Sequence, residues 1–200
     1  MTATNERLND CSPDGRLLLV SRTQGRDGLW VVPADQAIPH GEDRATQYLN
    51  SESFTETRGQ FFPLKDADGR SWVVYTSNES GEYEIYVESY PRGTQKERVS
   101  TRGGTQPRWR RDGKELFYIS PDLKLMAVAV VKKAQKLEFG PPAELFQTHI
   151  SLGGTLAYRM LRYDVTRDGQ RFLINSEPES ANPLSPSITV VLNWPAMLSR

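Results

Sequence analysis

Four Asp-Gly dipeptides, each leading into a short apolar run, constrain the fold of this chain more than any other feature. The aspartates are Asp14, Asp68, Asp112 and Asp168, and the apolar runs begin at residues 17, 72, 116 and 172. Asp-Gly between β-favouring segments is a strong short-range signal for a hairpin. Four copies of one hairpin signal form an internal repeat, and a repeat fixes the architecture before any single residue is interpreted.

The spacing of the repeat predicts the size of its unit. The four aspartates lie 54, 44 and 56 residues apart. A four-stranded β-propeller blade takes about 40–45 residues, so the middle interval fits directly and the outer two fit with insertions of about ten residues. We expect one insertion over residues 37–57, which are rich in Gly, Glu, Asp, Asn and Ser. The other is expected over residues 146–160 or over 176–187, which contain three prolines.

Apolar residues come in short runs bounded by Gly, Pro, Asp, Asn and Ser, which is typical of an all-β chain. The strands expected in the four repeats are 16–21 and 29–33; 59–62, 71–77, 83–89 and 97–100; 107–110, 115–119, 124–131 and 143–147; and 163–165, 170–175 and 188–193. A β-sandwich also has many short strands. It does not require the same turn chemistry at four equivalent positions, so the repeat favours the propeller.

Composition excludes several classes of partner. The 200 residues contain 25 acidic and 25 basic side chains, which gives no net charge to attract nucleic acid or an anionic membrane. No apolar run approaches the roughly 20 residues that span a bilayer, and the first residues lack the apolar core of a secretory signal. The single cysteine, Cys11, excludes an intramolecular disulfide and a cysteine-based zinc site.

The segment Asp66-Ala67-Asp68-Gly69 raises the possibility of a calcium site. In an EF-hand loop the glycine is the sixth residue, which would put Leu64 at the first ligand position and Tyr75 at the twelfth. Neither residue has a carboxylate to offer. Asp68 and Gly69 are therefore expected to form a turn, because these residue types supply its backbone geometry.

The basic segment 108–111, Arg-Trp-Arg-Arg, resembles a nucleic-acid patch. In a strand, however, Trp109 points to the face opposite Arg108 and Arg110. We expect a buried tryptophan, with the arginines at the rim or paired with neighbouring acids, since the net charge gives no support for nucleic acid.

Other chemical signals are isolated. The only histidines, His40 and His149, lie in expected loops without a further ligand nearby, whereas a metal site needs three or four. No Gly-x-Ser-x-Gly elbow is present to supply a hydrolase nucleophile. The triplet that begins at Asn78 matches a glycosylation acceptor, but its position between two expected strands indicates a turn.

Longer stretches carry a family resemblance. Residues 12–16, Ser-Pro-Asp-Gly-Arg, followed by an apolar strand resemble the PD40 (WD40-like) β-propeller repeat of the TolB type. Residues 75–87, 103–118 and 188–194 follow one another in an order that resembles the C-terminal propeller of bacterial, notably acidobacterial, transmembrane serine/threonine kinases. The resemblance covers nearly the whole chain and is weakest over residues 1–10 and 35–60.

This resemblance implies a non-catalytic propeller that acts as a sensor or interaction module. The Gly-rich loop, the His-Arg-Asp loop and the Asp-Phe-Gly motif of a kinase are all missing, so no kinase activity carries over to any residue of this chain. The location would be extracytoplasmic if the chain is attached to a transmembrane kinase, and cytoplasmic otherwise. A TolB-like periplasmic protein-interaction factor in envelope assembly or transport is the alternative.

Together these observations predict an all-β chain that forms a β-propeller of about four blades, in one repeat region over residues 1–200. The blades are expected near residues 8–50, 58–101, 103–148 and 158–195. We expect a partial or open ring, because the fourth repeat ends at its third strand and residues 1–10 are too polar to complete it. We expect no catalytic residue, cofactor or metal. The expected partner is a protein or small ligand at the rim or channel, or a second copy at an open blade edge, with the binding residues unassigned.

Overall fold

The computed structural model describes residues 5–24, 26–36, 45–64, 70–150, 161–176 and 187–192. Within these ranges the chain forms sixteen β-strands, one short 3₁₀ turn, η1 (Ala34–Gln36), and no α-helix. All of the strand pairs are antiparallel. The expected all-β class is therefore confirmed. A membrane-spanning helix, long and apolar enough for a bilayer, does not occur in this part of the chain.

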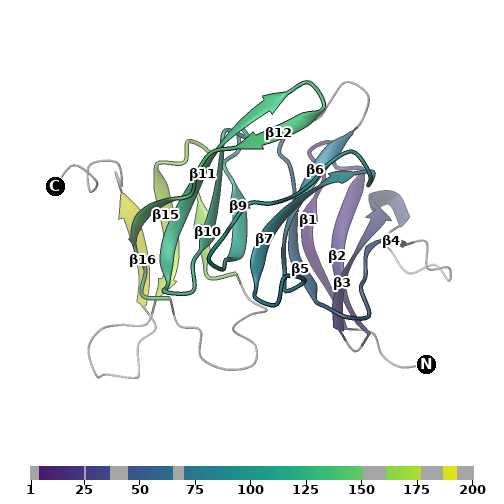
Figure 1. Cartoon of the computed structure of the whole chain (residues 1–200), viewed down its shortest axis with the longest axis horizontal. Helices are drawn as coiled ribbons and strands as arrows, with labels where there is room; N and C mark the ends of the chain where they lie inside the picture. The colour runs from purple at the N-terminus through teal and green to yellow at the C-terminus, as the bar shows by residue number, and fades with distance from the viewer. Residues whose placement is uncertain are drawn as a thin grey trace. The chain divides into compact units, whose positions relative to one another are not determined.

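The chain divides into two compact units, and the first, Met1–Gly103, contains two four-stranded sheets (Figure 1). In both sheets the strands lie side by side in chain order. The first sheet consists of β1 (Asn5–Cys11), β2 (Leu17–Gln24), β3 (Arg26–Pro33) and β4 (Thr46–Leu49). The second consists of β5 (Glu56–Phe61), β6 (Ser71–Ser77), β7 (Glu84–Tyr90) and β8 (Lys96–Arg98).

The second unit, Gly104–Arg200, contains a five-stranded sheet and a three-stranded sheet. The five-stranded sheet consists of β9 (Thr105–Trp109), β10 (Glu115–Ile119), β11 (Lys124–Lys133), β12 (Lys136–Phe139) and β13 (Ala143–Gln147). Its long strand β11 pairs with β13 along its first half and with β12 along its second. The three-stranded sheet consists of β14 (Tyr163–Val165), β15 (Arg171–Ser176) and β16 (Ser187–Leu192).

The core of the first unit lies between its two sheets. Strand β6 is buried on both faces, and for this reason its sequence is apolar at successive positions rather than alternating. Its odd-numbered residues face the first sheet. They join a cluster that comprises Leu19, Leu29, Val31, Tyr48, Leu49, Phe61, Val73, Tyr75 and Tyr86. Full burial of one such aliphatic side chain stabilises the fold by about 1.5–3 kcal/mol.

The core of the second unit is built in the same way from its own two sheets. Phe117 of β10 meets Phe172 of β15 edge to face, with ring centroids 5.0 Å apart. Ile119, Leu125 and Tyr163 are buried around this pair. Strand β15 alternates between exposed and buried residues, so it covers this core with one face.

The Asp-Gly turns share one backbone geometry in the three repeats where the structure describes them. Gly15, Gly113 and Gly169 have φ values of 72°, 70° and 73°. In each turn the glycine N–H donates to the carbonyl three residues earlier, at 2.8–2.9 Å. Glycine adopts this left-handed conformation without the steric cost of a Cβ atom. The predicted hairpin turns are thus confirmed at these three positions, while Asp68-Gly69 lies outside the described residues.

Strands β5 and β9 carry an identical irregularity. In β5 the register with β6 shifts between Thr57 and Gln60, and in β9 the register with β10 shifts over the corresponding residues. Arg58 and Gln106 occupy the same position in these two bulges, with positive φ values of 57° and 58°, and both are buried. A β-bulge changes the direction in which side chains point. In each of these sheets it coincides with one buried polar residue, Arg58 or Gln106.

Three strands were not predicted from the sequence. Strand β1 contains one apolar residue besides its terminal cysteine, and it is held by its ladder to β2 and by the Asn9 side-chain amide, which donates to Ser21 Oγ at 2.7 Å. Strand β4 lies inside the region expected to be an insertion, and only Tyr48 and Leu49 of it are buried. Strand β12 extends the third sheet with Leu137 as its buried residue.

The structure departs from the two expected insertions, because parts of both are strand. Residues 46–49 and 56–57 of the first insertion are strand, so the assignment of 37–57 to one loop is wrong. Short edge strands with few apolar residues leave little periodicity to detect. In the second, residues 146–147 belong to β13, while 151–160 and 177–186 lie outside the described residues.

Candidate functional site

The turn aspartates are the first candidates, because they are the most regular acidic residues of the chain. In each described turn the aspartate Oδ1 accepts a hydrogen bond from the backbone N–H two residues later, at 3.0–3.2 Å. The same oxygen accepts from the side chain two residues earlier, which is Ser12, Arg110 or Thr166, at 2.5–2.6 Å. These carboxylates hold the turns in shape, so they have little capacity left for chemistry.

The electrostatics of the turns agree with this role. The Arg110 guanidinium, which donates to Asp112, holds the pKa of that carboxyl below its usual range. The Thr166 hydroxyl similarly lowers the pKa of Asp168. Both groups are ionised at neutral pH and act as hydrogen-bond acceptors.

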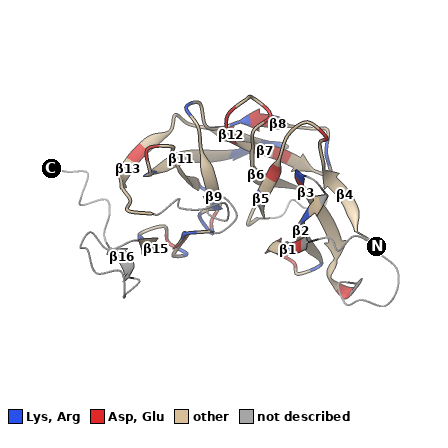
Figure 2. Cartoon of the chain, turned by 90° about the horizontal axis from the view of Figure 1, so that it is seen from below, with Lys and Arg blue, Asp and Glu red and all other residues tan. Residues whose placement is uncertain are grey.

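The basic segment 108–111 has the structure that was expected. Trp109 is buried, and Arg110 forms ion pairs with Asp112 at 2.6 Å and with Glu115 at 2.5 Å. Figure 2 shows acidic and basic residues on the strands of both units. The expectations of a buried Trp109 and of an arginine paired with neighbouring acids are therefore confirmed at Trp109 and Arg110.

Among the described residues, no three His, Cys, Asp or Glu side chains are placed to hold a metal ion. His149 is exposed at the end of the segment after β13. His40 and the acidic segment 66–69 lie outside the described residues, so the structure does not test them.

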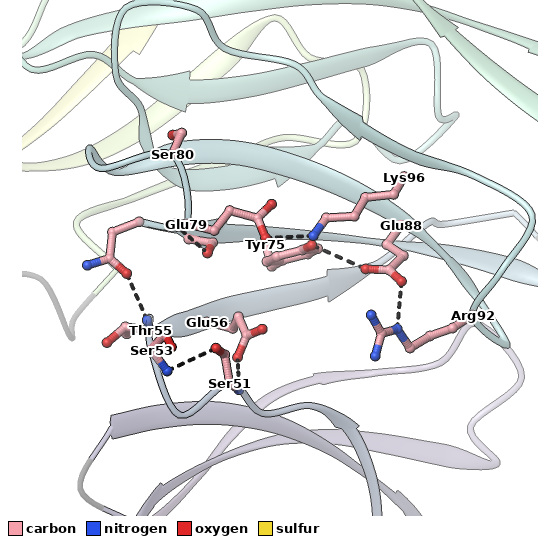
Figure 3. A network of polar contacts seen from close by, with 12 residues as sticks. Ser51, Ser53, Thr55, Glu56, Tyr75, Glu79, Ser80, Glu88, Arg92 and Lys96 are labelled. Carbon is pink, nitrogen blue, oxygen red and sulfur yellow. Dashed lines mark hydrogen bonds and ion pairs between the residues drawn. The ribbon is translucent and has the colours of Figure 1, made fainter.

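A network of polar contacts lies on the second sheet, on the face that packs against the first sheet (Figure 3). Its centre is the Glu88 cluster, which consists of Tyr48, Tyr75, Glu88 and Arg92. Glu88 Oε1 accepts from Arg92 Nε at 2.6 Å, and Glu88 Oε2 accepts from the Tyr75 hydroxyl at 3.3 Å. The Tyr48 hydroxyl, from the first sheet, lies 3.2 Å from the Glu88 carbonyl oxygen and 3.1 Å from that of Ser89.

Two further pairs extend this network toward the loop that follows β6. Glu56 accepts from the Ser51 backbone N–H at 3.0 Å. Lys96 Nζ lies 2.6 Å from Glu79 and also over the Tyr86 ring, 5.6 Å from its centroid. These contacts join β6 to β7 through Tyr75 and Glu88, tie Lys96 of β8 to Glu79 and Tyr86, and hold Glu56 of β5 to the segment before it.

Glu84 lies at the other end of the same face and is also buried. It accepts a hydrogen bond from the hydroxyl of Ser100, which is fully buried. The same hydroxyl oxygen accepts from the Ile85 backbone N–H at 2.7 Å. This contact fastens the end of β7 to the segment after β8.

Burial changes the pKa values of two tyrosines and one glutamate in this network. It raises the pKa of Tyr48 and that of Tyr75 well above the ordinary value of a phenol, with the charge of Glu88 adding to the effect. Both phenols remain protonated and donate hydrogen bonds. Burial also raises the pKa of Glu56. The arrangement is suited to joining strands, since its donors are matched by acceptors.

Sequence reasoning missed this acidic face. The apolar residues at 83, 85 and 87 gave the alternation of a half-exposed strand, which places Glu84, Tyr86 and Glu88 in solvent. All three are buried. The one available signal was Tyr86, an aromatic residue between two glutamates on what would have been the exposed face.

Comparisons with known proteins give a likeness in structure alone. No family model matches this sequence, and no curated protein does. A candidate TolB from Agrobacterium tumefaciens has a TM-score of 0.51 and 16% identity over 70% of this chain and 50% of that one. A candidate 6-phosphogluconolactonase from Bacteroides uniformis has a TM-score of 0.50 and 15% identity over 94% of this chain and 55% of that one.

These neighbours define the class of fold. The chain has the antiparallel sheets of a β-propeller and resembles TolB in structure, as the four repeats predicted. It spans about half the length of the two solved structures that it matches.

Proposed function

We propose that this chain is a non-catalytic propeller module that recognises a protein or a small ligand. The observation that carries the proposal is the use of its acidic side chains. The aspartates of the three described turns hold those turns, and the buried Glu88, Glu84 and Glu56 accept hydrogen bonds from Arg92, Ser100 and the Ser51 backbone N–H. A catalytic acid needs a geometry that leaves it able to exchange a proton with a substrate.

Two biological settings fit such a module. The first is the sensor or scaffold region of a bacterial serine/threonine kinase, supported by the ordered stretches 75–87, 103–118 and 188–194. The second is a TolB-like partner in envelope assembly or transport, supported by the structural likeness to a candidate TolB. The DNA upstream of the Met1 codon separates them. A kinase domain and membrane segment encoded there favour the first setting, and an envelope transport operon favours the second.

An enzymatic alternative is lactone hydrolysis, since one structural neighbour is named as a candidate 6-phosphogluconolactonase and matches 94% of this chain. Hydrolysis of 6-phosphogluconolactone by the purified chain tests it directly. We expect the rate to equal that of buffer alone, with an active lactonase as the positive control. Hydrolysis that rises in proportion to the amount of this chain would contradict the non-catalytic proposal.

A further inference from the structure

A second polar cluster lies within the second unit, where β9 and β14 come together. The β9–β14 cluster consists of Gln106, Arg108, Arg162 and Asp164. Gln106 Oε1 accepts from the Arg162 backbone N–H at 2.7 Å, and Arg108 Nε lies 3.8 Å from Asp164 Oδ1. The Tyr163 hydroxyl donates to the Gln106 carbonyl oxygen at 2.9 Å, which fixes the two strands to each other.

This cluster contains more donors than acceptors. Gln106 Nε2, Arg108 Nε and Arg162 Nε are all buried, and in the described part of the chain none of them has a hydrogen-bond partner. The one carboxylate of the cluster, Asp164, is too distant from Arg108 Nε for a hydrogen bond. Folded proteins rarely leave buried donors unpaired, because each one has lost its water without gaining an acceptor.

The orientation of the Gln106 amide is set by its surroundings. Its oxygen must face the Arg162 backbone N–H, which can only donate, so its NH₂ group is the end without an acceptor. Gln106 is 1% exposed and lies at the bulge of β9 with a positive φ. The Gln106 NH₂ group is therefore unpaired, as are the Nε groups of Arg108 and Arg162 in the same cluster.

Neighbouring acids do not supply the missing acceptor. Asp112 and Glu115 are both engaged by Arg110. The cluster itself has two guanidinium charges and one carboxylate. It is reachable from solvent, because the Arg108 side chain is 19% exposed and that of Asp164 is 67% exposed.

We propose that the β9–β14 cluster binds an anionic group, either a carboxylate or a phosphate, of the ligand that this module recognises. Guanidinium groups present planar pairs of donors that match the oxygens of both anions. A bound oxyanion would accept from Arg108, Arg162 and the Gln106 amide at the same time. This inference rests on the proposed recognition function and names the chemistry of one of its sites.

Calorimetric titration of the whole chain with inorganic phosphate and, separately, with succinate at constant ionic strength tests the site. We expect saturable binding of at least one anion, and the ratio of the two dissociation constants names the preferred group. The double variant Arg108→Gln/Arg162→Gln should weaken binding at least tenfold. The matched control is Arg111→Gln, which removes an exposed arginine from the same region.

The double variant removes donors that lack acceptors, so we expect it to fold. An unchanged circular dichroism spectrum would show that any loss of binding is not caused by unfolding. Absence of saturable binding to both anions would overturn the site, as would equal weakening by Arg111→Gln. Neither result affects the proposal that the module is non-catalytic, which lactone hydrolysis tests separately.

Discussion

The Glu88 cluster of the first unit and the β9–β14 cluster of the second differ in how their charges are matched. Glu88 is nearly fully buried, and each of its carboxylate oxygens has a donor. In the β9–β14 cluster three buried nitrogens lack an acceptor in the described residues. A buried polar network with every group satisfied stabilises one arrangement of strands. A network with donors left over is the better candidate for a ligand site.

The largest effect is expected at Glu88. Glu88→Ala leaves the buried Tyr75 hydroxyl and the Arg92 Nε–H group without their Glu88 acceptor, so we expect a loss of about 3 kcal/mol in unfolding free energy. Glu88→Gln keeps an acceptor and should cost about 1 kcal/mol. Urea denaturation of the two variants measures the difference. Equal losses would contradict this expectation, because they would show that the acceptor retained in Glu88→Gln contributes nothing.

A smaller loss is expected at the turn that precedes β10. Asp112→Ala removes the acceptor for the Lys114 backbone N–H and one of the two acids that engage Arg110, which should cost about 1 kcal/mol. The lowered pKa of Asp112 makes this contribution present above the unfolded-state pKa and lost as the pH falls through the folded-state value. Denaturation at pH 7 and pH 2 should show the wild type and the variant converging in acid.

Burial of Glu56 gives a pH dependence of the opposite sign. Its pKa is raised in the folded chain, so the stability is highest below the unfolded-state pKa and falls as the pH rises through the folded-state value. Glu56→Gln abolishes this dependence and keeps an acceptor for Ser51. Between pH 4 and pH 7, we expect the unfolding free energy of the variant to rise relative to that of the wild type by less than about 1 kcal/mol. Thermal denaturation over this range would contradict the account if the two profiles were parallel.

The smallest effect on stability is expected at Arg162. Its side-chain Nε has no acceptor in the described residues, so Arg162→Gln should change the unfolding free energy by no more than about 0.5 kcal/mol. The same urea experiments measure it. A loss as large as that for Glu88→Ala would show that Arg162 is a structural residue and would remove the contrast between the two clusters.

The sequence predicted the features that depend on local chemistry. Gly15, Gly113 and Gly169 adopt the left-handed conformation that Asp-Gly turns require, and the strands around Leu116 and Phe172 lie where the apolar runs placed them. These features follow from a few neighbouring residues. The all-β class and the propeller-type fold follow in turn from their repetition.

The remaining features depend on contacts between distant residues. Strand β1 has almost no apolar pattern, and the structure pairs it with β2 through an antiparallel ladder. Glu84 and Glu88 occupy positions that alternation assigns to solvent, yet both are buried, with partners in Ser100 and in Tyr75 and Arg92. The β9–β14 cluster joins Gln106 to Arg162, 56 residues apart, through a bulge that no sequence pattern marks.

Nuclear magnetic resonance of the arginine Nε–H groups tests the contrast between the two clusters most directly. In a ¹⁵N-labelled chain titrated with phosphate or succinate, the account predicts saturable shifts of the Arg108 and Arg162 signals. The Arg92 and Arg110 signals should stay in place, because Glu88, Asp112 and Glu115 already occupy those groups. Equal shifts of all four signals, or no shift of any, would contradict the account.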